Sequence, residues 1–137
     1  MSKSQISYSI DLPCNATLAF TAWLDSEKHG EMVDGVADIN PTIGGKFSIW
    51  EDSIIGKTTL VDRENLTIEQ DWRYNYDDWP ANEPSKIVVK YEPVDDNNCK
   101  LIFKQSDVPD KYVNDVKDGW QEYYWKPMKR YFEAKTD

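Results

Sequence analysis

The chain has 137 residues, with 16 lysines and arginines against 25 aspartates and glutamates, and a net charge of −9 at pH 7. This length suits a single domain spanning residues 1–137 around one core, and the negative charge opposes binding to nucleic acid or anionic membrane. No apolar run approaches the roughly 20 residues that a membrane-spanning helix needs, and the first residues lack the apolar core of a secretory signal. We therefore expect a cytoplasmic protein.

The N-terminal part predicts one strand followed by two short helices. Residues 5–12 alternate between apolar and polar side chains, which is typical of a half-buried strand, and Pro13 ends it. Asn15 can cap a helix to Leu24, whose apolar face includes Leu18 and Trp23. Asp25 or Ser26 can cap a second helix to about residue 33.

A run of strands follows in the middle of the chain. After a short strand at 36–39, the alternation predicts strands at 46–51, 54–61, 66–74, 86–92 and 99–105. Short polar connections predict that consecutive strands pair antiparallel, and the longest loop is 75–85. The side chains expected on the core face are Phe47, Ile49, Leu66, Ile68, Gln70, Trp72, Ile87, Val89, Tyr91, Leu101, Phe103 and Gln105.

Residues 110–135 predict one long amphipathic helix. Apolar side chains recur at the spacing of three and four that places them on one side, at Val113, Val116, Trp120, Tyr123, Tyr124, Pro127, Met128 and Tyr131. Gly119 and Pro127 disfavour a helix. We expect Gly119 to allow another backbone to approach closely, and Pro127 to bend the axis.

These elements predict an α+β fold, with a curved antiparallel sheet of about seven strands around the C-terminal helix and two short helices after the first strand. Curling would bury one face of the sheet against the helix and leave a cavity between them. A flat two-layer α+β domain is the alternative. The hairpin-length connections favour the curved sheet.

With its strands and helices in this order, the sequence resembles the START-like, helix-grip (SRPBCC) superfamily, and within it the C-terminal domain of activators of the Hsp90 ATPase. The resemblance lies in Gly44-Gly45-Lys46-Phe47, Trp72-Arg73, Trp79-Pro80, Val108-Pro109, the helix segment Gly119-Trp120-Gln121-Glu122-Tyr123-Tyr124-Trp125, Lys129 and Tyr131-Phe132. It implies an Hsp90-type chaperone as partner. Eukaryotic activators that resemble this domain also carry an N-terminal domain that supplies most of the activation. Since 137 residues leave no room for it, we expect little ATPase stimulation.

The residues themselves do not point to catalysis. His29 is the single histidine, and the polar segment around it reads as an exposed helix end, so we expect a surface histidine. Cys14 and Cys99 lack metal-ligand spacing, and we expect reduced structural thiols. We therefore expect no enzyme activity, no metal and no cofactor.

Two kinds of binding site are compatible with the sequence. The expected cavity would be lined by Gln70, Trp72, Tyr91, Phe103, Gln105, Trp120 and Tyr124, and could hold an apolar small molecule or lipid. Gln70 and Gln105 would then face the ligand, although hydrogen bonding within the core is the favoured alternative for both. On the surface, Trp125, Lys126, Lys129 and Arg130 could contact an acidic partner, or could simply suit the dipole of the helix end.

From these observations we favour a non-enzymatic interaction module of the co-chaperone type. The alternative is a carrier of an apolar ligand.

Overall fold

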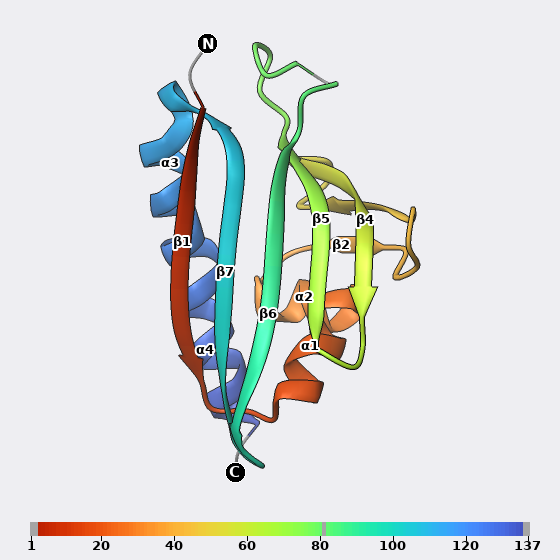
Figure 1. Ribbon diagram of the computed structural model, residues 1–137, viewed down its shortest axis with the longest axis vertical. Coiled ribbons are helices and arrows are strands. Elements are labelled where there is room, and N and C mark those ends of the chain that lie inside the picture. Colours follow the sequence, from red (N-terminus) through yellow and green to blue (C-terminus); the bar gives the residue numbers. More distant parts are fainter. Residues whose placement is uncertain (1–2, 81, 136–137) are drawn as a thin grey trace.

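The computed structural model describes residues 3–80 and 82–135, and it contains one antiparallel sheet with helices on one face (Figure 1). The seven strands lie in the order β1-β7-β6-β5-β4-β3-β2. They are β1 (Lys3–Leu12), β2 (Ala37–Ile39), β3 (Lys46–Ile49), β4 (Ile54–Asp62), β5 (Thr67–Tyr74), β6 (Ser85–Asp95) and β7 (Asn98–Pro109). The predicted α+β helix-grip architecture is thereby confirmed, including the antiparallel pairing of consecutive strands from β2 to β7.

Two short helices, α1 (Ala16–Leu24) and α2 (Ser26–Met32), connect β1 to β2 as predicted. Both caps are also those expected. The Asn15 side chain accepts hydrogen bonds from the backbone of Thr17 and Leu18, and the Asp25 side chain accepts one from Lys28. The prediction that Leu18 faces the core is wrong, because 61% of this residue is exposed. The α1 face that packs inward is centred on Trp23 and Phe20 instead.

The inner face of the sheet is built by simple alternation along each strand. On β5, for example, Ile68, Gln70 and Trp72 are buried while the residues between them are partly exposed. Among the predicted core positions, Leu66 is the exception: it lies before β5 with a φ of 50° and is only partly buried. The inner face meets α1 and the C-terminal helix, so the core lies between the sheet and the helices.

The side chain of Arg73 forms several of the hydrogen bonds that hold the loop between β5 and β6. The guanidinium group of Arg73 donates hydrogen bonds to the backbone carbonyl oxygens of Tyr76, Trp79 and Pro80. Trp79 is buried, and its ring stacks on Tyr112 with 5.7 Å between the centroids. The Trp-Arg and Trp-Pro pairs of the sequence therefore organise this loop against the start of the C-terminal helix.

The C-terminal helix is continuous from residue 110 to 134 but is not α-helical throughout. A 3-10 turn, η1 (Asp110–Tyr112), leads into α3 (Val113–Gly119), followed by a π-helical segment, η2 (Trp120–Trp125), and then α4 (Lys126–Ala134). Pro127 lies in the first turn of α4. Because proline cannot donate a hydrogen bond and its ring clashes with the carbonyl group four residues earlier, a wide turn just before it is favourable.

The π-helical segment explains which residues of this helix are buried. They recur every four residues, at Val116, Trp120, Tyr124, Met128 and Phe132, with Trp125 beside them. In an α-helix of 3.6 residues per turn, each step of four would rotate the side chain by about 40° away from the core. The wider π turn removes part of this drift.

Two predictions for this helix are wrong. Tyr123 is 63% exposed, because the π turn carries it away from the inner face. No backbone approaches Gly119: a Cβ atom there would meet only the Tyr123 ring, at 4.0 Å. Within residues 3–80 and 82–135, no helix is long and apolar enough to cross a membrane.

Candidate functional site

The residues proposed for an inner cavity lie in the core, and each is at most 2% exposed. The Trp120 ring contacts those of Phe103, Tyr124 and Trp72, at centroid distances of 4.3, 4.7 and 5.3 Å. Tyr91 lies apart from this cluster and packs on Phe20 of α1. Aromatic rings in mutual contact therefore occupy the space between β5, β7 and the C-terminal helix.

The side-chain amides of Gln70 and Gln105 each form two hydrogen bonds within the core, one through the oxygen and one through the nitrogen. The Gln70 oxygen accepts from the indole N–H of Trp23 at 3.0 Å, and its nitrogen donates to Thr58 at 3.1 Å. The Gln105 oxygen accepts from the indole N–H of Trp120 at 2.8 Å, and its nitrogen donates to Ser85 at 2.9 Å. This is the hydrogen bonding within the core that was the alternative to ligand contact. A role of these seven residues in ligand binding stays a prediction.

The expected surface position of His29 is wrong, since only 1% of this residue is exposed. Its Nδ1 lies 2.8 Å from the carbonyl oxygen of Trp23, which can only accept, so Nδ1 carries the proton. Nε2 therefore accepts from the hydroxyl of Tyr124, also at 2.8 Å. Burial lowers the pKa of His29 to about 4, which keeps the ring neutral at pH 7.

An open groove follows the C-terminal helix where it faces the turn between β3 and β4, and we call it the helix groove. Its wider part, of about 550 Å³, is lined by Val33, Asp34, Trp50, Ser53, Glu122, Tyr123, Pro127 and Arg130. Its narrower part, of about 200 Å³, reaches inward between the ends of β4 and β5 and the helix, and is lined by Trp50, Ser53, Ile54, Tyr74, Tyr76, Asp115, Val116, Gly119, Tyr123 and Tyr124. Trp50, Ser53 and Tyr123 belong to both parts.

The Trp50 ring forms one wall of the helix groove. It lies edge-on to Tyr123 and Tyr124, at centroid distances of 6.1 and 5.6 Å. On its other side it packs against Gly35, where a Cβ atom would lie 2.2 Å from the indole ring. Any larger residue at position 35 would displace Trp50.

The turn that carries Trp50 has an unusual backbone. Trp50, Glu51 and Asp52 have φ values of 53°, 54° and 70°, a left-handed conformation that non-glycine residues seldom adopt. Hydrogen bonds hold it: the Trp50 N–H donates to Val36, and the Trp50 carbonyl accepts from the Ser53 hydroxyl. Strained backbone and π-helical segments both concentrate at functional sites, and here they face each other across one groove.

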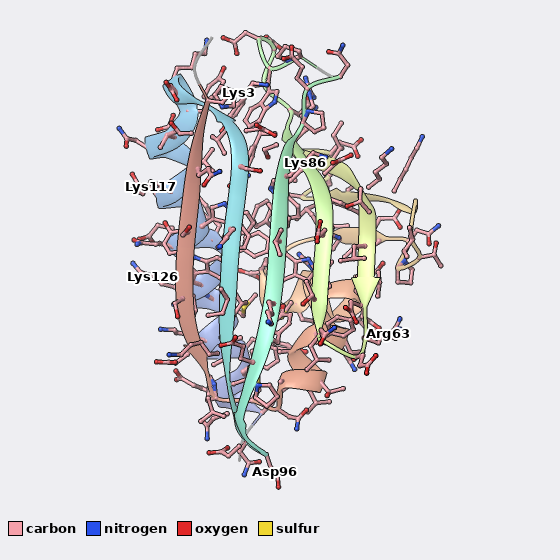
Figure 2. All side chains as sticks on the ribbon, viewed as in Figure 1. Lys3, Arg63, Lys86, Asp96, Lys117 and Lys126 are labelled. Carbon is pink, nitrogen blue, oxygen red and sulfur yellow. The ribbon has the colours of Figure 1, made fainter. Side chains whose placement is uncertain are left out.

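The predicted partner-contact residues are divided by the structure. Lys126, Lys129 and Arg130 are exposed, and Arg130 lines the wider part of the helix groove. Figure 2 shows Lys126 at the side of the molecule beyond β1, and it forms an ion pair with Glu122 at 2.6 Å. Trp125 is only 3% exposed and packs on Phe103 and Trp120, so its ring is not available as a surface anchor.

The two cysteines are buried free thiols that lie together. A hydrogen bond between them lowers the pKa of Cys99, whereas the same contact and burial raise the pKa of Cys14. Among the residues that the structure describes, no three or more histidine, cysteine, aspartate or glutamate side chains are placed to hold a metal ion.

Sequence reasoning missed Trp50 and the exposed position of Tyr123. A signal for Tyr123 was present in the constant four-residue repeat from Val116 to Phe132, which does not fit a regular α-helix. No comparable signal marks Trp50, because its place depends on Gly35 and on the distant C-terminal helix.

The sheet wrapped on a long C-terminal helix defines a START-like helix-grip protein. The sequence matches the family described as activator of Hsp90 ATPase homolog 1-like protein over residues 13–133, and the chain belongs to that family. A search of curated protein sequences finds no significant match.

Solved structures are similar in fold. An HSP90 activator from Plasmodium falciparum shares 23% identity, covers 88% of this chain and 89% of its own, and has a TM-score of 0.78. A protein from Mesorhizobium loti shares 16% identity over 98% of this chain and 99% of its own, with a TM-score of 0.80. Norcoclaurine synthase from Thalictrum flavum shares 10% identity over 99% and 98%, with a TM-score of 0.67. At these identities the likeness concerns the fold.

Proposed function

We propose that this protein is a non-enzymatic interaction module of the co-chaperone type that docks on an Hsp90-type chaperone through the helix groove. The observation that carries the proposal is the family match over residues 13–133, and the fold likeness to an HSP90 activator agrees with it. The groove offers what a docking surface needs. The exposed ring of Tyr123 and the partly buried ring of Trp50, with Arg130 beside them, are the residue types that dominate binding energy at interfaces.

The proposal that this protein is not an enzyme is supported by the hydrogen bonds and the pKa of its histidine, His29. Both of its ring nitrogens are engaged in hydrogen bonds inside the core, and its lowered pKa of about 4 suits a structural role. A general base at pH 7 would instead need a pKa near the working pH and contact with a substrate.

The proposed contact combines apolar and electrostatic parts. The helix groove supplies Trp50 and Tyr123 as rings, while Lys126, Lys129 and Arg130 supply positive charge on a protein of net charge −9. Such local charge favours association with an acidic surface and makes the rate depend on salt. The helix groove and the three basic residues offer a small contact area. Interfaces that bury less than about 1,200 Å² are usually weak, so we expect micromolar affinity.

The experiment measures binding of the full chain to the Hsp90 of the same organism by calorimetry at two salt concentrations. We expect Tyr123→Ala to weaken binding by about ten-fold, which corresponds to ~1.4 kcal/mol. The triple reversal K126E/K129E/R130E should weaken binding and flatten the salt dependence of the affinity. The matched control K90E/K100E/K104E changes the same net charge on the outer face of the sheet and should bind like the wild type.

Two results would retire this proposal. One is no measurable binding by the wild type at high micromolar concentration. The other is an equal loss in the helix variants and in the outer-face control, because binding would then depend on net charge alone.

A second candidate function is the binding of a small apolar ligand in the narrower part of the helix groove. It is supported by the aromatic lining of that pocket, which includes Tyr74, Tyr76 and Tyr124. Its volume of about 200 Å³ is below the 300–1,000 Å³ that is usual for drug-sized ligands, so any ligand held there would be small.

A further inference from the structure

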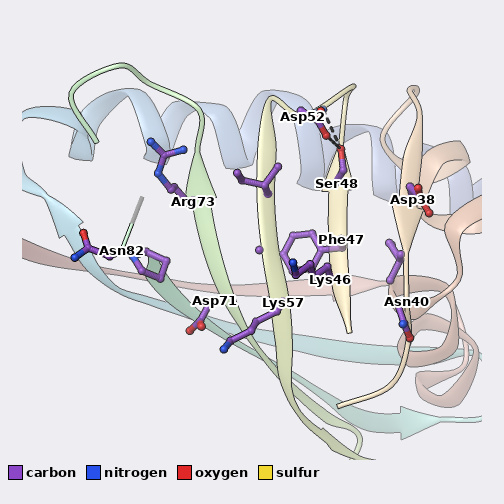
Figure 3. A pocket seen from close by; sticks show the side chains of 14 residues that line it. Asp38, Asn40, Lys46, Phe47, Ser48, Asp52, Lys57, Asp71, Arg73 and Asn82 are labelled. Atoms are coloured by element: carbon purple, nitrogen blue, oxygen red, sulfur yellow. Dashed lines mark hydrogen bonds between the residues drawn. The ribbon is translucent and has the colours of Figure 1, made fainter. Parts of the chain in front are cut away.

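The outer face of the sheet contains a second pocket, of about 780 Å³, that the proposed docking does not use (Figure 3). We call it the outer-sheet pocket. Its lining residues on β3, β4 and β5 include Lys46, Ser48, Ile55, Lys57 and Arg73, which alternate with the buried positions of the same strands. The pocket therefore opens away from the C-terminal helix.

A row of side chains runs across the strands at one end of this pocket. Lys46 on β3 is directly opposite Lys57 on β4, Lys57 is opposite Asp71 on β5, and Asp71 is opposite Lys86 on β6. Asp71 forms an ion pair with Lys86 at 3.1 Å. In the described parts of the chain, neither Lys46 nor Lys57 forms an ion pair.

One pair in this row, Lys46 and Lys57, is unfavourable for the free protein, whereas Asp71 lies opposite both Lys57 and Lys86. Like charges directly opposite each other on neighbouring strands destabilise a sheet. The row contains three lysines and one aspartate, so it carries an excess of two positive charges on a protein whose net charge is −9. Asp71, on the other side of Lys57, offsets this repulsion only in part, and an anion held between Lys46 and Lys57 would relieve it.

The rest of the pocket supplies an apolar surface and, at one end, acidic side chains. Ile55, Gly56 and Phe47 also line the pocket, of which Ile55 is partly exposed, whereas Phe47 is 4% exposed and packs inward on Trp72. At Gly56 a Cβ atom would lie 1.9 Å from the backbone oxygen of Asp71 and 2.7 Å from the Phe47 ring, so β4 and β5 approach closely here and only glycine fits. The acidic residues Asp38 and Asp52 lie toward the opposite end from Lys57 in Figure 3.

We propose that the outer-sheet pocket binds a small organic anion, whose carboxylate or phosphate group lies between Lys46 and Lys57 and whose apolar body packs on Ile55. The pocket volume lies within the range of small-molecule sites. Charge-assisted hydrogen bonds from two ammonium groups are the strong kind that such an anion would use. This site is on the other face of the sheet from the helix groove and does not depend on chaperone binding.

The test uses the full chain with three probes: 1-naphthyl phosphate, 2-naphthoate and inorganic phosphate. Binding is followed by calorimetry and by NMR shifts of the backbone amides and the lysine ammonium groups. We expect saturable shifts at Lys46, Lys57 and Ile55 with at least one naphthyl probe. The stronger of the two identifies the preferred charged group.

K46Q/K57Q should lose about ten-fold or more in affinity, since two hydrogen bonds to a charged group are removed. The matched control K90Q/K104Q removes two charges from the same sheet face outside the pocket, and should bind like the wild type. K46Q/K57Q should also unfold close to the temperature of the wild type, because the repulsion between the lysines and the attraction of Lys57 to Asp71 are lost together.

The inference is overturned by any of three results. The first is no saturable shift at the pocket residues at millimolar probe. The second is an equal loss of affinity in K46Q/K57Q and K90Q/K104Q. The third is inorganic phosphate binding as tightly as 1-naphthyl phosphate, which would exclude a contribution from the apolar surface.

Discussion

The hydroxyl group of Tyr124 donates a hydrogen bond to Nε2 of His29, and this bond joins α2 to the π-helical segment across 95 positions of the sequence. Both residues are buried, and burial lowers the pKa of His29 while it raises the pKa of Tyr124. Each group is therefore held in its neutral form near pH 7. A charge on the imidazole would lose the hydrogen bond from Tyr124, because Nε2 could no longer accept.

The first prediction is that stability decreases as the pH falls through the range of His29 titration. The unfolded pKa is about 6.5 and the folded value is about 4, so the unfolded chain binds the proton first. The contribution of neutral His29 is complete above pH 6.5 and is lost progressively as the pH falls toward 4. Between pH 7.5 and 5 the loss should be about 2 kcal/mol in the free energy of unfolding.

Urea unfolding at several pH values checks this, with His29→Gln as the comparison. That variant should be less stable at pH 7.5 but should change less between pH 7.5 and 5. Parallel curves for the two proteins would mean that His29 does not titrate in this range.

The second prediction concerns the burial of Trp120. Its side chain is 1% exposed and contacts Phe103, Tyr124 and Trp72, so Trp120→Ala should cost about 3 to 5 kcal/mol of unfolding free energy. Tyr123→Ala on the same helix serves as the control, because its exposed ring should contribute less than about 0.5 kcal/mol. A loss below about 1 kcal/mol for Trp120→Ala in chemical denaturation would contradict its place in the core.

The third prediction tests the π-helical segment by changing the length of the helix. Deleting Tyr123 would bring Tyr124 to three residues and Trp125 to four residues after Trp120, which is the spacing of one face of an α-helix. We therefore expect the deletion variant to fold cooperatively, with nearly the same helix content by circular dichroism. Inserting one alanine after Tyr123 should be far more destabilising, because the inner residues would rotate further from the core. Equal losses in both variants would count against this account.

The fourth prediction addresses the second candidate function. Since the rings of Trp72, Phe103 and Trp120 fill the space under the C-terminal helix, we expect no uptake of sterols or diacyl lipids by the wild type. Small aromatic compounds that fit the narrower part of the helix groove should bind instead, and Gly119→Leu should block them because it fills open space. Native mass spectrometry with lipid extracts and with indole distinguishes these outcomes. Stoichiometric binding of a sterol or lipid would support an inner cavity that opens.

Much of the fold could be predicted because it depends on local periodicity. Alternation alone placed Ile68 and Trp72 on the inner face, and the side chains of Asn15 and Asp25 marked two helix starts. These patterns are fixed by neighbours along the chain. They do not depend on which distant elements later pack against them.

The positions that could not be predicted depend on distant contacts. His29 lies in a polar segment, and its burial follows from a tyrosine far along the chain. Trp50 was expected within a strand, but β3 ends at Ile49 and the next three residues adopt a left-handed turn. Both misjudged residues lie close to Tyr124, where the helix departs from α geometry.

The left-handed turn at Trp50, Glu51 and Asp52 has a consequence for how this protein can change over evolution. A non-glycine residue in this conformation costs about 1 kcal/mol relative to glycine, so glycine at position 51 would make the fold more stable. Glycine would also loosen the segment that fixes the Trp50 ring. If the helix groove is the docking surface, selection for a rigid aromatic wall opposes selection for stability at this position.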